Sequence, residues 1–186
     1  LIIVPPQLRI PASLQAAVVR HGPSVYESRL YRALGDLYVE KERYQDGAEA
    51  YRAGEGKPGA IDFRPYNALN RLALQALALP EKDSQRDAAI ALAQQCRLAA
   101  AEAYKRGANF WDAVMEPEAL LVERLLDGGF MQVGEGGRPA FEEVARAYRE
   151  TLSNLTVKPR ELDSMVSQMG LLSRFCDALY VVSQDP

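Results

Sequence analysis

The chain has 186 residues, enough for one domain with a sizeable hydrophobic core. Its 22 basic and 25 acidic residues give a net charge of -3, which argues against a nucleic-acid-binding surface, so no DNA partner is expected. The apolar runs are too short for a membrane span or a secretory signal, and Cys96 and Cys176 lie in apolar helical patterns that favour buried free thiols in a reducing cytoplasm.

Residues 1–22 are expected to form a linker, or the end of an upstream domain, together with a short helix from Ser13 that stops at Gly22. The first residue is not methionine, which suggests an excised piece or a processed product of a longer protein. A helical repeat domain is expected over residues 23–183.

Helix start and stop signals divide this domain clearly. Ser24 and Glu27 have the spacing of a capping box, and Asp62 is expected to cap a helix that has Pro65 in its first turn. Apart from the ambiguous first four residues, no segment alternates with the period of a strand, so the predicted fold is all-α, with about seven helices in antiparallel hairpins. The expected helices cover about 24–43, 44–53, 62–80, 84–106, 109–127, 139–155 and 159–183.

One helical hairpin, first seen over residues 31–54, recurs along the chain. Its anchor positions are Tyr31, Leu34, Gly35 and Tyr38 on the first helix and Tyr44, Gly47, Tyr51 and Gly54 on the second. Looser matches follow at Tyr66, Leu69, Asn70 and Ala73, and then at Trp111, Val114 and Met115. This pattern resembles the tetratricopeptide repeat (TPR), which implies a TPR-like α-solenoid. Gly59 departs from it, because the family has a proline at that point.

The second half of the chain resembles a narrower group, the bacterial TPR-S sensor-type domains. The similarity covers about residues 24–178 and lies in the strings PYNALNRLAL, NFWDAV, YRETL and RELDSMVSQMGLL. Such domains adjoin effector domains and are proposed to sense a nucleotide-type or protein signal. The resemblance therefore implies a sensor that regulates an effector domain outside this sequence.

The TPR register implies which polar side chains line the concave face of the solenoid. Four arginines are expected to converge there, and their planar guanidinium groups suit carboxylate or phosphate, so an anionic ligand is predicted, either nucleotide-type or an acidic peptide. The alternative is a solvated surface on which these arginines pair with acidic neighbours. The predicted ligand-binding residues are Arg29, Arg32, Arg64, Asn67, Arg71, Gln75 and Asp112.

Several neighbouring positions favour structural roles. Asn70 takes the small-residue position between helices and is predicted to be a buried amide. Asp112 can also serve as a helix cap with Asn109, and Tyr66 and Trp111 are expected to pack in the core.

No catalytic or metal-binding pattern stands out. His21 is the only histidine, and the glycine-rich residues 134–137 lack the lysine of a phosphate loop, so no enzyme, metal or cofactor is expected. The predicted function is a non-catalytic binding or sensor domain. The alternative is a passive scaffold that docks a peptide or a second copy of the chain, which allows a homo-oligomer.

Overall fold

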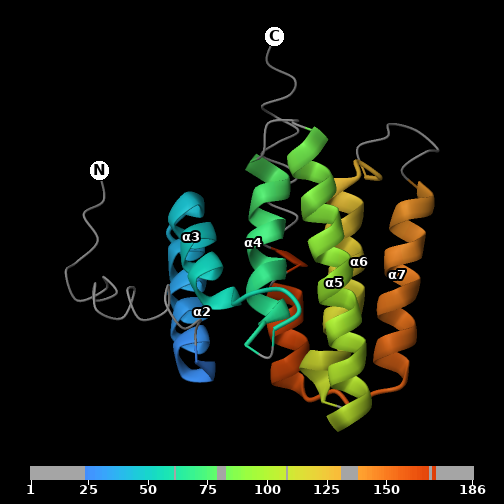
Figure 1. Ribbon diagram of the computed structural model, residues 1–186. Helices are drawn as coiled ribbons and strands as arrows, with labels where there is room; N and C mark the ends of the chain where they lie inside the picture. Colours follow the sequence, from blue (N-terminus) through green and yellow to red (C-terminus); the bar gives the residue numbers. More distant parts are fainter. Residues whose placement is uncertain are drawn as a thin grey trace. The chain divides into compact units, whose positions relative to one another are not determined.

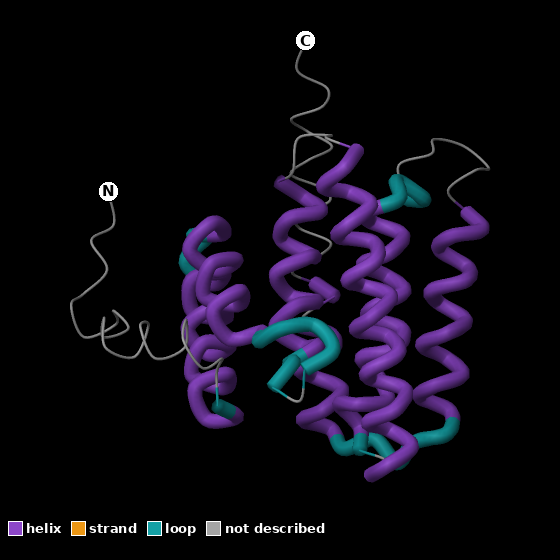
Figure 2. The backbone as a smooth tube through the Cα atoms, in the orientation of Figure 1, coloured by secondary structure: helices purple, strands orange, loops and turns teal. Residues whose placement is uncertain are grey.

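The computed structural model describes residues 24–60, 62–78, 83–107, 109–130, 138–167 and 169–170. These ranges contain helices and short loops but no strand (Figure 2), so the all-α prediction is confirmed for the described part of the chain. The helix expected after Ser13, His21 and Cys176 lie outside it.

The helices follow one another closely along the chain (Figure 1). A further helical stretch covers residues 159–167. The chain divides into two compact units, residues 1–71 and 72–186, with the boundary inside α4, and each unit is described by itself. The labelled helices are α2 (Val25–Glu40), α3 (Tyr44–Glu55), α4 (Pro65–Ala78), α5 (Asp83–Gly107), α6 (Phe110–Leu126) and α7 (Arg138–Ser153).

In the first unit, α2 and α3 form an antiparallel hairpin. The predicted capping box is confirmed, because the Ser24 amide donates to Glu27 and the Glu27 amide donates to the Ser24 hydroxyl. Gly35 lets the helices approach closely, since a Cβ atom there would lie 2.5 Å from Cε1 of the buried Tyr51 ring. The small residue and the aromatic ring of the repeat pattern therefore meet.

The loop between α3 and α4 differs from the expectation in one respect. Pro65 occupies the first helical position, where its missing amide hydrogen costs no hydrogen bond, so Asp62 lies too far upstream to cap α4. Gly56 instead explains the course of the loop. It has φ +73°, and a Cβ atom there would lie 2.5 Å from the carbonyl oxygen of Asp62.

Gly54, at the end of α3, permits contact between all three helices of the first unit. A Cβ atom on Gly54 would overlap the side-chain amide nitrogen of Asn67 and would lie 2.8 Å from Cβ of Tyr31. The close contact at Gly54 therefore leaves no room for even one methyl group.

A Gly54→Ala variant is expected to lower the free energy of unfolding by about 1–3 kcal/mol, because overpacking outweighs the gain in helix propensity. Chemical denaturation followed by circular dichroism measures the change. Gly107→Ala is the matched control, because a Cβ atom at Gly107 meets nothing within 4 Å. Equal effects of the two substitutions would contradict the packing of α3 described here.

In the second unit, α6 packs against both α5 and α7. The α5 side of this core consists of small residues, namely Ala89, Ala93, Cys96 and Ala100, which confirms the prediction of a buried thiol at Cys96.

The prediction for Trp111 is wrong, because its side chain is exposed and packs edge-on against the buried Phe110. Phe110 occupies the buried position that was expected for Trp111. The TPR-like solenoid arrangement of the hairpins stays a prediction.

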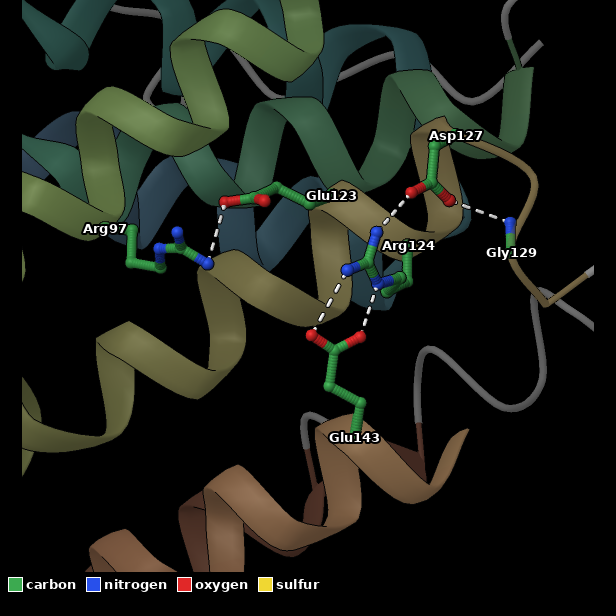
Figure 3. A network of polar contacts seen from close by, with 6 residues as sticks. All are labelled: Arg97, Glu123, Arg124, Asp127, Gly129 and Glu143. Carbon is green, nitrogen blue, oxygen red and sulfur yellow. Dashed lines mark hydrogen bonds and ion pairs between the residues drawn. The ribbon is translucent and has the colours of Figure 1, made fainter. Parts of the chain in front are cut away.

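An arginine at the end of α6 links that helix to α7 and to the loop that follows α6 (Figure 3). Arg124 donates two hydrogen bonds to Glu143, from Nε at 2.8 Å and Nη2 at 3.2 Å, and a third to Asp127 at 2.6 Å. Asp127 also accepts a hydrogen bond from the amide of Gly129. One guanidinium group thus binds two carboxylates within the unit.

Candidate functional site

The four arginines of the predicted seam belong to the first unit, but they are not equivalent. Arg71 is only 7% exposed, and its guanidinium group forms a two-pronged ion pair with Glu55, from Nε at 2.7 Å and Nη2 at 3.1 Å. Its predicted position on an open surface is therefore wrong. Arg71 connects α4 to the end of α3, and its proposed role in ligand binding stays untested.

The two asparagines of α4 have exchanged the roles expected for them. Asn67 is 2% exposed and donates a hydrogen bond of 3.1 Å to the carbonyl oxygen of Ser28 on α2. Asn70 is partly exposed and donates to Tyr66 within its own helix. Asn67 is thus the buried amide between helices, which explains why it lies against Gly54.

Arg29 and Arg32 are both exposed on α2. The Arg32 guanidinium lies 5.1 Å from the ring centroid of Tyr66, an arrangement in which the aromatic face attracts the cation. Arg64 lies at the start of α4, partly exposed, and its Nη1 donates to the carbonyl oxygen of Phe63. Of the predicted arginines, the two on α2 are therefore the most accessible.

Asp36 lies one turn beyond Arg32 on the same side of α2 and accepts a hydrogen bond of 2.7 Å from the Tyr51 hydroxyl. Desolvation raises the pKa of Asp36, while the Tyr51 hydrogen bond and the charge of Arg32 oppose that rise. Burial also raises the pKa of Tyr51, so the phenol stays neutral and keeps donating to Asp36. This arrangement fixes the carboxylate beside Arg32.

Apolar side chains flank the two arginines of α2. Tyr26 is 71% exposed, and Val25 and Leu30 are also exposed. At 100° per residue, these residues and the arginines span about 160° of the helix surface. We call this surface, Val25, Tyr26, Arg29, Leu30 and Arg32, the α2 face.

The remaining two predicted ligand residues belong to the second unit. Gln75 is partly exposed on α4. Asp112 lies in the first turn of α6, where its backbone amide donates to the side chain of the N-cap residue Asn109 and its carboxylate contacts the amide group of the same side chain. The structure thus supports the alternative role of Asp112 in a helix cap, and ligand binding by these two residues stays a prediction.

A buried carboxyl group on α6 was not predicted from the sequence. Glu118 is 5% exposed, and burial alone raises its pKa to about 8. Burial, and to a lesser extent the charge of Glu118, raises the pKa of the Tyr148 phenol on α7. Five residues further along α6, Glu123 is also buried but pairs with Arg97 of α5 at 3.7 Å (Figure 3). The available signal was the position of Glu118 in an apolar stretch directly after Pro117.

No family model matches the chain, and neither a curated protein nor a solved structure matches it. The resemblance to TPR and TPR-S domains therefore stays a prediction.

Within the described ranges, no three His, Cys, Asp or Glu side chains are placed to hold a metal ion. None of the helices described has the length and apolar character needed to cross a membrane.

Proposed function

We propose that the chain is a non-catalytic, cytoplasmic helical-repeat domain of the TPR type that binds an acidic peptide segment of a partner protein on the α2 face. The observation that carries the proposal is the exposure of Arg29 and Arg32 beside Tyr26 and Leu30. Tyrosine and arginine are enriched in protein interfaces, where they supply much of the binding energy.

The charge of the α2 face favours an acidic partner. Guanidinium groups bind carboxylates through paired hydrogen bonds. The guanidinium group of Arg32 also lies over the ring of Tyr66. Asp36 offsets part of the charge of Arg32, but its carboxylate is bonded to the Tyr51 hydroxyl, and Glu27 is bonded to the Ser24 amide. Acidic side chains of a partner would pair with the arginines.

The apolar part of the α2 face favours a peptide over a nucleotide. A peptide that alternates acidic and apolar side chains can place its carboxylates on the arginines and its apolar groups on Tyr26, Leu30 and Val25. A free nucleotide would need donors for its phosphates, and the amides at the start of α2 are partly occupied by the Ser24 capping box. The TPR-S resemblance supports the further proposal that such binding regulates an adjoining effector domain.

Fluorescence anisotropy with a labelled synthetic peptide of alternating Glu and Leu residues tests the proposal. We expect the wild type to bind this peptide and the Arg29→Ala/Arg32→Ala variant to bind it at least tenfold more weakly, a loss of about 1.4 kcal/mol. Binding should also weaken as salt is added, because the arginines are exposed.

The control is Arg52→Ala, which removes an exposed arginine of α3 in the same unit. Its affinity should equal that of the wild type. If both variants lose affinity equally, or if ATP stabilises the protein while the peptide does not bind, the α2 face is not an acidic-peptide site.

A further inference from the structure

The outer surface of α5 has a pattern that the proposed function does not use. Leu98 is 67% exposed in the middle of this 25-residue helix. Between residues 88 and 101 the only charged residue is Arg97, which pairs with Glu123 of α6. The exposed residues of this central section are therefore uncharged, which is unusual for a long surface helix.

Six of the exposed residues of α5 form a stripe along the helix. At 100° per residue these six fall within about 80° of one another, on the side opposite the buried Ala93, Cys96 and Ala100. The members of the stripe are Asp87, Ala91, Gln94, Leu98, Glu102 and Lys105.

Four of the six members of this stripe are placed symmetrically about residue 96. Asp87 and Lys105 lie 9 residues on either side of that position, and Gln94 and Leu98 lie 2 residues on either side. When two such helices cross in antiparallel orientation at residue 96, Asp87 of each copy meets Lys105 of the other, and each Leu98 meets a Gln94. A parallel pair would instead place like charges opposite each other.

We propose that the chain forms a homodimer in which the α5 helices of two copies pair antiparallel along this stripe. Charge complementarity identifies the occupant, because Asp87 and Lys105, near opposite ends of the stripe, can pair with a second copy of the same helix only when the two run antiparallel. The twofold axis produces each contact twice, so two Asp87–Lys105 pairs flank the two central Leu98–Gln94 contacts.

The existing partner of Lys105 does not oppose this arrangement. Lys105 pairs with Glu102 on its own helix at 2.8 Å, but both side chains are well exposed, and such pairs contribute little to stability. The ammonium group can therefore turn to Asp87 of the second copy. One helix face, about 37 Å long, buries less area than a standard interface, so the dimer should be weak and should depend on concentration.

Sedimentation equilibrium over a range of protein concentrations, up to the millimolar range, measures the association of the full chain. The weight-average mass of the wild type should rise towards that of a dimer. Leu98→Glu should weaken association at least tenfold, while Leu162→Glu, at an exposed leucine outside α5, should leave it unchanged.

Charge exchange tests the orientation of the helices. Asp87→Lys and Lys105→Asp should each weaken the dimer, and the combined Asp87→Lys/Lys105→Asp variant should regain most of the affinity. Circular dichroism verifies that each variant is folded, and the exchange series decides the question if Leu98→Glu does not fold. A wild type that stays monomeric throughout, or a combined variant that associates as weakly as its parents, would overturn the proposal.

Discussion

A Glu118→Gln variant is expected to be more stable than the wild type at alkaline pH and to lose most of the pH dependence that the wild type shows. Burial raises the pKa of Glu118 from 4.5 to about 8. Between these values the unfolded chain has released the proton while the folded chain keeps it. The free energy of unfolding of the wild type should therefore fall as the pH rises through this window, by a few kcal/mol in all.

Below the unfolded pKa the stabilisation from neutral Glu118 is fully present, and it is lost by the time the pH has passed the folded pKa. Urea unfolding at about pH 5, about pH 7 and about pH 9 measures the effect. Glu116→Gln is the matched control, since Glu116 is exposed two residues away on the same helix. A Glu118→Gln variant with the pH profile of the wild type would contradict this account of the second unit.

An Arg71→Ala variant is expected to lose about 3–5 kcal/mol of stability, because it leaves the carboxylate of Glu55 partly buried without its main cation. Melting of the first unit should be detectable by hydrogen exchange in α2 and α3. Lost ligand binding in this variant would report unfolding and not the loss of a ligand contact.

The double variant Arg71→Met/Glu55→Gln tests whether the unpaired carboxylate of Glu55 causes the loss of stability. It removes both charges and keeps most of the side-chain volume, so it should recover much of the stability lost in Arg71→Ala. If Arg71→Ala changes stability by less than about 1 kcal/mol, the ion pair is not a main support of the hairpin. Arg29→Ala should have almost no effect on stability, because its side chain is exposed.

The sequence predicted the features that depend on local spacing. The capping box of Ser24 and Glu27, the first-turn position of Pro65 and the cap formed by Asn109 all need residues only a few positions apart, and all three are confirmed. The repeat pattern marked Gly35 and Tyr51 as anchor positions of one hairpin, and these two residues meet in the structure.

The sequence did not predict which polar residues of α4 are buried. Asn67 and Asn70 are both amides on one helix, three residues apart, and the contacts of Asn67 with Gly54 and Ser28 decide which of them faces inward. Arg71 likewise looked accessible because Glu55, its partner, lies across a loop on another helix. These outcomes depend on tertiary contacts, which helical periodicity does not determine.

The burial of Glu118 was not predicted from the sequence for a related reason. Acidic residues are rarely buried, so a glutamate in an amphipathic helix is expected at the surface. α6, however, packs against α5 on one side and α7 on another, which leaves it little exposed surface over this stretch. The width of the buried face of a helix depends on how many neighbours it has.

The most direct test of the central claim is an NMR titration of the isotope-labelled chain with the Glu/Leu peptide. Chemical-shift changes should concentrate on the backbone amides of residues 25–36 and on the side-chain NH groups of Arg29 and Arg32. They should vanish in the Arg29→Ala/Arg32→Ala variant, whose spectrum should otherwise stay that of a folded protein. Changes confined to other helices, or a peptide that leaves the α2 amides unshifted at saturation, would contradict the proposed function.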